Sequence, residues 1–473
     1  MIRRKLCLLL LLCLSLSGFA QIKLGGHIAD NMVLQQMTTI AVTGKATPHK
    51  AIKAITGWGS VYKVKTDKTG GFTIYLKTPK AGGPYTIRFD DGQVLEIKNV
   101  LIGEVWLAAG QSNMEMKVKG YDAKQPVLNK EAMVQEASGK PAIRFLTVGN
   151  PPAKDPQEDI TGNWKETDER SVLEYSAVAY AFASRLYREL NVPIGIIVAA
   201  NSGTRIESWM SRETLESIRD RFLTLNLPFS KNSPAAMYNA MIAPLAGFKI
   251  KGVLWYQGEA NRMAPGTYLK QFPAFVSNWR QRWKNASLPF YTVEIAPYTY
   301  PEDKDKAYVT AFFRESQQKL SSLVENVGIV STVDVGSVTA LHPPEKAAVG
   351  DRLAGLALAN TYLKKNVGAA SVYRSFYTEG DRAMVQFTNC TGLEVAGKTV
   401  SDIEIAGSDQ VFYPATAVVQ GCKLIVWSGN VSLPRSVRYC FKAYSKGRIY
   451  NQYGLPVPPF RTDNWSVMAG KVQ

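Results

Sequence analysis

The sequence is poor in the side chains that most often bind metals. Among its 473 residues are three histidines and five cysteines. Zinc sites in proteins use clusters of Cys and His ligands, usually at short spacings. Because the sequence has no such cluster, we expect no metal site and no cofactor. Three cysteines lie near the C-terminus: Cys390, Cys422 and Cys440. In an oxidising compartment one pair of them can form a disulfide and leave one thiol unpaired.

Acidic residues are also scarce. The chain has 39 Asp and Glu against 56 Lys and Arg, which gives a net charge of +17. The basic residues are dispersed and form no run interleaved with aromatic residues, so we expect no nucleic-acid partner. The excess positive charge fits either a lysine-rich surface or an anionic substrate. Repeats and low-complexity tracts are missing too, as is typical of a globular protein.

Only the first residues contain a long apolar run. Arg3, Arg4 and Lys5 precede apolar residues 6–16, and small residues follow up to Ala20. This pattern predicts a signal peptide over residues 1–20, cleaved after Ala20, and a secreted or periplasmic mature protein. The run is shorter than the roughly 20 residues that span a bilayer, so we expect no membrane insertion. The oligomeric state is not indicated.

The pattern of apolar residues divides the mature chain into three parts. Residues 21–98 alternate short strands, such as 72–76 and 85–89, with glycine-containing turns, which predicts an N-terminal β-domain of the sandwich type. Residues 366–473 return to the same character and predict a C-terminal β-domain, either separate or packed with the first.

Between these regions, residues 99–365 alternate apolar strands with amphipathic helices. This alternation predicts a three-layer α/β core, with a parallel sheet of the flavodoxin-like kind covered by helices on both faces. The expected strands lie near 100–109, 192–199, 250–256, 290–295 and 327–333, and the expected helices near 174–190, 267–284, 312–323 and 345–363.

Polar segments follow several of these strands, at the sheet edge where α/β proteins place their sites. Ser112 follows the first core strand at a glycine-containing turn, and a serine hydroxyl needs a neighbouring base to act as a nucleophile. His342 is the one histidine of the core region and follows the 327–333 strand. Its imidazole suits proton transfer at neutral pH. We therefore predict Ser112 as nucleophile and His342 as general base.

A nucleophilic serine also requires donors for the oxyanion that develops on the substrate. The candidates are the backbone amides of Ser112 and Gly203 and the side chain of Gln257, with Asn261 as an alternative to Gln257. Glu259 is expected to order its loop rather than to act as a base. Glu259 and Asn261 are also placed beside the bound substrate.

Five segments resemble, in order, those of the sialate O-acetylesterase family, which belongs to the serine hydrolases named for their Ser, Gly, Asn and His blocks. The segments are Gly103–Glu115, Ser202–Trp209, Trp255–Asn261, Leu341–Lys346 and Tyr450–Asp463. The resemblance implies removal of acetyl groups from an O-acetylated sugar through an acyl-serine intermediate. Ser112 would attack the acetyl carbonyl, and His342 would protonate the departing sugar and then activate water.

The sequence departs from related hydrolases just before the histidine. Those enzymes often place an aspartate two or three residues upstream, where this chain has Ala340 and Thr339. Asp334 is the nearest upstream acid. Either Asp334 orients His342, or a backbone carbonyl holds the ring and the site is a Ser-His dyad.

The family name suggests O-acetylated sialic acid as the substrate, whose carboxylate could pair with Arg205 or Arg262. Acetylxylan or another acetylated glycan remains an alternative, as does a non-sugar acyl ester. A carbohydrate-binding protein without catalytic activity is the alternative from another class.

Overall fold

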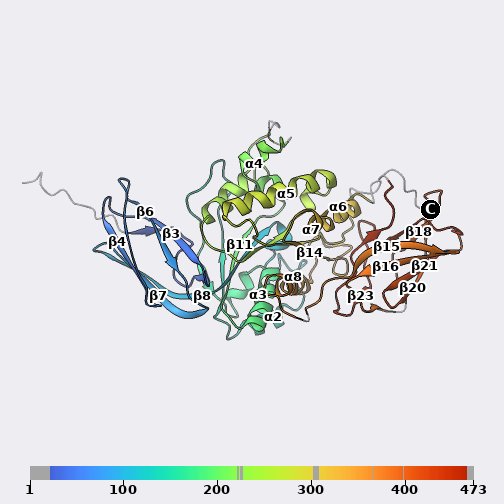
Figure 1. Ribbon diagram of the computed structural model, residues 1–473, viewed down its shortest axis with the longest axis horizontal. Helices are drawn as coiled ribbons and strands as arrows, with labels where there is room; N and C mark the ends of the chain where they lie inside the picture. Colours follow the sequence, from blue (N-terminus) through green and yellow to red (C-terminus); the bar gives the residue numbers. More distant parts are fainter. Residues whose placement is uncertain are drawn as a thin grey trace, which may run out of the picture.

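The computed structural model describes residues 22–220, 223, 227–301, 308–365, 367–397 and 399–465. The predicted signal peptide, residues 1–20, lies outside these ranges. Within them, no helix has both the length and the apolar character needed to cross a membrane. The molecule is elongated, with the α/β core in the middle and the two β regions at opposite ends of its long axis (Figure 1). The N-terminal and C-terminal β regions therefore do not pack on each other.

The N-terminal β region consists of two facing layers. One is the antiparallel sheet of β1 (Lys23–Leu24), β3 (Thr39–Lys45) and β6 (Gly71–Lys77). The other contains β4 (Ala51–Thr56), β5 (Val61–Lys65) and β7 (Gly82–Asp90). Alternate residues such as Ile74 and Ile87 point into a shared apolar core, as expected for a sandwich. The predicted strands 72–76 and 85–89 are confirmed as parts of β6 and β7.

The strand β8 (Val94–Gly110) joins this region to the core. Its first half pairs with β7 and with β2 (Val33–Gln35), and its second half lies between two core strands. Residues 94–99 include exposed side chains, whereas every residue from 100 to 110 is buried. A strand covered on both faces is apolar throughout, whereas a half-exposed strand alternates apolar and polar residues. The sequence therefore indicated a core strand only for the buried part of β8. The strand runs without a break through the boundary predicted at residues 98 and 99.

The core sheet has the order β10-β9-β11-β8-β12-β13-β14. All neighbouring pairs are parallel except β9 with β10. The strands are β9 (Ile143–Thr147), β10 (Trp164–Glu166), β11 (Ile194–Ala200), β12 (Gly252–Tyr256), β13 (Phe290–Val293) and β14 (Val327–Val330). This arrangement confirms the predicted parallel α/β core.

Helices cover both faces of this sheet (Figure 1). Side chains of α3 (Ala177–Leu190) and α8 (Lys346–Asn360) share one apolar cluster with Trp106 and Ala108 of β8. On the opposite face α5 (Pro265–Arg282) shares a cluster with Leu107 and Ala109. Successive residues of one strand thus enter two different cores, which defines a three-layer sandwich. Further helices are α1 (Ser112–Glu115), α2 (Lys130–Ala137), α4 (Arg212–Ser217), α6 (Val309–Gln318) and α7 (Leu320–Leu323).

The C-terminal β region encloses a separate apolar cluster. Its strands are β15 (Val372–Glu379), β16 (Arg382–Thr388), β17 (Leu393–Val395), β18 (Ile403–Ala406), β19 (Phe412–Pro414), β20 (Thr416–Gln420), β21 (Lys423–Trp427), β22 (Ser436–Tyr439), β23 (Ile449–Asn451) and β24 (Phe460–Arg461). Cys390 and Cys422 form a disulfide, and Cys440 is a buried free thiol. One pair and one thiol are what the cysteine count allowed. Burial raises the pKa of Cys440 to about 12, so this thiol is unreactive near neutral pH.

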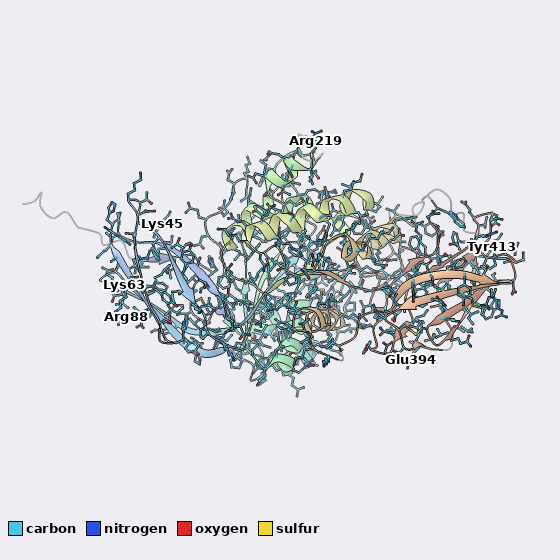
Figure 2. The ribbon with its side chains drawn as sticks, viewed as in Figure 1. Lys45, Lys63, Arg88, Arg219, Glu394 and Tyr413 are labelled. Atoms are coloured by element: carbon cyan, nitrogen blue, oxygen red, sulfur yellow. A yellow bond between two sulfur atoms is a disulfide. The ribbon has the colours of Figure 1, made fainter. Side chains whose placement is uncertain are left out.

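Part of the positive charge lies on solvated surface far from the core. Lys45, Lys63 and Arg88 are exposed residues of the N-terminal β region, and their side chains extend outward (Figure 2). Lys45 pairs at 3.3 Å with Glu158, which is also exposed. Such side chains add to net charge without forming a binding site.

The contact between the ends of β8 and β12 gives a stability prediction. Gly110 has φ of +140°, and a Cβ at this position would lie 2.1 Å from the carbonyl oxygen of Tyr256. We expect Gly110→Ala to lower the free energy of unfolding by about 3 kcal/mol, from backbone strain and overpacking. Chemical denaturation measures this loss.

Gly266→Ala is the matched control, because Gly266 lies in the first turn of α5 and a Cβ there meets no atom within 4 Å. Its stability should stay within about 1 kcal/mol of the wild type. Equal stability of both variants would contradict the proposed close approach.

Candidate active site

Ser112 lies where β8 ends and α1 begins. The adjoining strands of the sheet are β11 on one side and β12 on the other, so the chain leaves β8 at a topological switch point. The Gln111 amide donates to the carbonyl oxygen of Tyr256 at 3.0 Å, and the Asn201 amide donates to that of Gly110 at 3.0 Å. These bonds join the ends of the three strands, and they place the loops after β11 and β12 beside the nucleophile candidate.

His342 reaches the same place from the loop after β14. The side-chain amide of Asn113, next to Ser112, donates to the Leu341 carbonyl oxygen at 3.3 Å. The ring of Tyr121 lies 4.9 Å, between centroids, from the His342 ring, and its hydroxyl donates to the Ser112 carbonyl oxygen at 2.7 Å. Among the described residues no hydrogen bond joins Ser112 directly to His342. The structure nevertheless brings both predicted catalytic residues into one site.

The imidazole of His342 is half-buried. Its Nδ1 lies 2.7 Å from the Oε1 of Gln125. Burial, together with the positive charge of Lys346, lowers the pKa of His342 to about 4. The ring is therefore neutral at physiological pH, which is the form that a general base requires.

The structure contradicts the predicted pairing of Asp334 with His342. Arg352 holds both carboxylate oxygens of Asp334, at 2.8 and 2.6 Å, and the Tyr450 hydroxyl donates to one of them at 3.1 Å. A bidentate arginine pair is strong and fixes the carboxylate in place. Asp334 thus fastens the end of the β14 strand region to α8 and the C-terminal β region. The alternative of a backbone carbonyl is not seen either, because the Nδ1 partner is a side chain.

Two of the three predicted oxyanion donors remain available. No hydrogen bond within the described part of the chain uses the backbone amide of Ser112 or of Gly203. Gly203 has φ of +68°, and the Nζ of Lys231 would lie 3.6 Å from a Cβ at this position. Because Gly203 has no side chain, its backbone is not covered on the side that faces the Lys231 ammonium group.

Gln257 is occupied elsewhere. Its side-chain amide donates to the Thr204 carbonyl oxygen at 3.0 Å and to Asn261 Oδ1 at 2.8 Å. Both of its N–H groups therefore have protein acceptors, and the structure does not support Gln257 as an oxyanion donor. Asn261, the alternative donor, gives its own amide to Glu207 at 3.0 Å and accepts from the Ile206 amide at 3.0 Å. Gln257 and Asn261 tie the loop after β12 to the loop after β11.

Glu259 belongs to a buried polar cluster behind the nucleophile candidate. It accepts a hydrogen bond from Asn113 Nδ2 at 2.6 Å. The Lys346 ammonium donates to the other side of the same amide, Asn113 Oδ1. Burial raises the pKa of Glu259, and it lowers the pKa of Lys346 to about 7. The cluster holds Asn113 from both sides, and Glu259 is itself buried.

The two predicted carboxylate-binding arginines also have protein partners. Arg205 pairs with the fully buried Glu207 at 3.2 Å and donates to the Ala260 carbonyl oxygen at 3.1 Å. The guanidinium of Arg262 lies 3.9 Å from the centroid of the Tyr300 ring. Both arginines therefore contribute to the framework of the site.

Sequence reasoning missed several residues of this site. Asn113 and Lys346 lie inside the quoted motifs, and Lys346, four residues after His342, could have been recognised from its place in the motif. Tyr121 and Gln125 lie in a segment without any recognisable motif. Glu207 also went unnoticed, although it lies between Arg205 and Trp209 of a quoted segment.

The site combines a serine and a neutral histidine with two open backbone amides at the switch point of a parallel α/β sheet. These are the groups that the chemistry of a serine esterase requires. Comparison with known proteins gives the family. The family described as "Carbohydrate esterase, sialic acid-specific acetylesterase" matches residues 102–364, more than half of the chain. The chain belongs to this family and is a carbohydrate esterase.

Individual relatives agree with this assignment. The human protein named sialate O-acetylesterase is 27% identical over 73% of this chain and 72% of its own length. The mouse protein of that name is 25% identical over 76% of this chain and 77% of its own. A solved structure of a carbohydrate acetylesterase from Xanthomonas citri is 35% identical and has a TM-score of 0.85. The match covers 94% of this chain and 100% of the solved one.

The partners of Asp334 lead to a test that separates stability from catalysis. Asp334 and Arg352 are 8% and 10% exposed. Removing the carboxylate with Asp334→Ala leaves a buried arginine unpaired and should lower the free energy of unfolding by about 3 kcal/mol. Chemical denaturation checks this. Glu158→Ala, which breaks the exposed Lys45 pair, is the control and should change stability by less than about 1 kcal/mol.

The milder Asp334→Asn variant reports on catalysis. Measured well below its unfolding temperature, its kcat should remain within about tenfold of the wild type. A loss of about 10⁴-fold, as for the acid of a Ser-His-Asp triad, would show instead that Asp334 serves His342.

Proposed function

We propose that this carbohydrate esterase removes O-acetyl groups from sialic acid through an acetyl-Ser112 intermediate. The observation that carries the mechanism is the assembly of Ser112, the neutral His342 and the Gly203 amide at one end of the core sheet. Family membership supplies the reaction type, and the local charge favours an acidic sugar.

The Ser112 hydroxyl attacks the acetyl carbonyl carbon while the Nε2 of His342 accepts its proton. The carbonyl oxygen becomes an oxyanion, stabilised by the backbone amides of Ser112 and Gly203. His342 returns the proton to the sugar oxygen as the C–O bond breaks, which leaves acetyl-Ser112. A water then attacks this ester with His342 again accepting the proton, and acetate leaves as the serine is restored.

Lys231 supports an anionic substrate. Its Nζ lies next to Gly203, and within the described residues no carboxylate is within 4 Å of it. An unneutralised ammonium beside the acyl site can bind the carboxylate of a sialic acid, whereas a neutral xylan unit offers no such group. Since Arg205 and Arg262 already have protein partners, Lys231 is the cation we assign to this contact.

The test of the proposed activity is acetate release from 9-O-acetylated sialic acid and from acetylated xylan. Ser112→Ala should lower kcat by about 10⁴-fold or more, because the nucleophile is lost. The wild type should act on the sialic acid. Activity on xylan alone would be consistent with the proposed mechanism and would reject sialic acid as the substrate. Full activity of Ser112→Ala would reject the nucleophile. Failure of the wild type on both substrates would reject sialic acid and xylan and leave another acetylated glycan as the substrate.

Lys231 gives a separate prediction about the sugar. Lys231→Met should raise KM for 9-O-acetylated sialic acid by about tenfold, since one charged hydrogen bond contributes about 1.5 kcal/mol or more. KM for a small neutral acetyl ester should not change. Lys231→Arg keeps the charge and serves as the control. An equal effect of Lys231→Met on both substrates would contradict carboxylate recognition.

A further inference from the structure

The His342 ring is held by a residue far from it in sequence. Gln125 belongs to residues 117–129, a segment between α1 and α2 that we call the strap. The Oε1 of Gln125 lies 2.7 Å from the Nδ1 of His342. An amide oxygen only accepts hydrogen bonds. This contact therefore places the proton on Nδ1 and leaves the Nε2 lone pair available for the serine hydroxyl.

The strap is fixed on both sides of Gln125. The Tyr121 amide donates to the Gln125 carbonyl oxygen at 3.2 Å, and Asp122 Oδ1 accepts from the Gln125 amide at 3.0 Å. The Leu128 amide donates to the Pro344 carbonyl oxygen at 3.0 Å, two residues beyond His342. Gly120, with φ of +83°, makes the turn possible, because a Cβ there would lie 2.5 Å from the Gln125 carbonyl oxygen.

We propose that Gln125 is the positioning residue of the catalytic histidine and takes the place that an aspartate has in a Ser-His-Asp triad. This inference rests on the proposed role of His342 as general base. Three observations carry it: the Nδ1 contact, the Tyr121 ring against the imidazole, and the engagement of Asp334 by Arg352.

A neutral partner changes how the histidine titrates. An aspartate stabilises the imidazolium form by its charge, whereas an amide oxygen offers only its dipole. Charged or titratable groups near the ring in the described part of the chain include Lys346 of α8, the hydroxyl of Tyr121 and, behind Asn113, Glu259. Burial and Lys346 lower the pKa of His342 to about 4, so the base stays neutral in mildly acidic solution. We expect activity to persist down to about pH 5.

The sign of the effect is set by the charge at position 125. Gln125→Glu places a carboxylate on Nδ1, which favours the imidazolium form and raises the pKa of His342. The acid limb of kcat/KM against pH should move upward by about 1–3 units. Gln125→Ala removes the acceptor, so kcat should fall by about 10–100-fold with little change in KM.

The kinetic control lies in the same strap. Lys124→Ala removes an exposed side chain next to Gln125, and the pH profile and kcat should match the wild type. An unmoved acid limb in Gln125→Glu, or a wild-type kcat in Gln125→Ala, would overturn the inference.

A second measurement is independent of activity. The chain has three histidines, so the ¹⁵N spectrum of the histidine-labelled protein is simple to assign with a His342→Gln variant. His342 should show the Nδ1-protonated tautomer and titrate below pH 5, and Gln125→Glu should raise its pKa. The Nε2-protonated tautomer would overturn the inference.

Recording the same spectra in the Ser112→Ala protein separates the two proposals. Failure of the proposed function appears as activity that survives Ser112→Ala, whereas failure of the Gln125 inference appears in the tautomer and the titration.

Discussion

The close approach of the Gly110 backbone to the Tyr256 carbonyl oxygen is the contact on which the active site depends. Because position 110 carries no Cβ, β8 can end directly against β12, and the Gln111 amide then bonds to the same Tyr256 carbonyl. The side chain of Gln111 in turn accepts from the amides of Gly258 and Ala260 at 3.3 and 3.4 Å. These contacts fix the loop after β12 beside Ser112, and none of them involves the side chain of Ser112 or of His342.

Buried polar side chains around this backbone junction hold the loops of the site in place. Asn113 is held between Glu259 and Lys346, and Glu207 holds Asn261 and Arg205. In a low-dielectric interior each of these groups needs a partner, so the arrangement is strongly determined. Gln257 and Glu259, two residues expected at the substrate, have hydrogen-bond partners in the loops around Ser112.

The sequence predicted the parallel core and the placement of Ser112 and His342, because apolar strands and the polar segments after them follow simple periodic rules. It did not show where β8 begins, since residues 94–98 of this strand fell inside the predicted N-terminal β-domain. The partner of His342 could not be predicted from the residues near it. Gln125 reaches the ring across more than two hundred positions of the chain, and no spacing rule connects two separate loops. Asp334 was the nearest acid in the sequence. Nearness in sequence does not show that Arg352 of α8 binds its carboxylate.

The continuity of β8 has a consequence for how the molecule moves and how it is divided. One strand carries backbone hydrogen bonds of the N-terminal sandwich along its first half and those of the core along its second half. No flexible linker separates the two parts at this point, so they form a stiff unit along β8. Removing the N-terminal region would expose the first half of β8 as an unpaired edge, open to aggregation. The sandwich is therefore an extension of the catalytic sheet rather than an exchangeable module, and it holds a fixed position relative to Ser112.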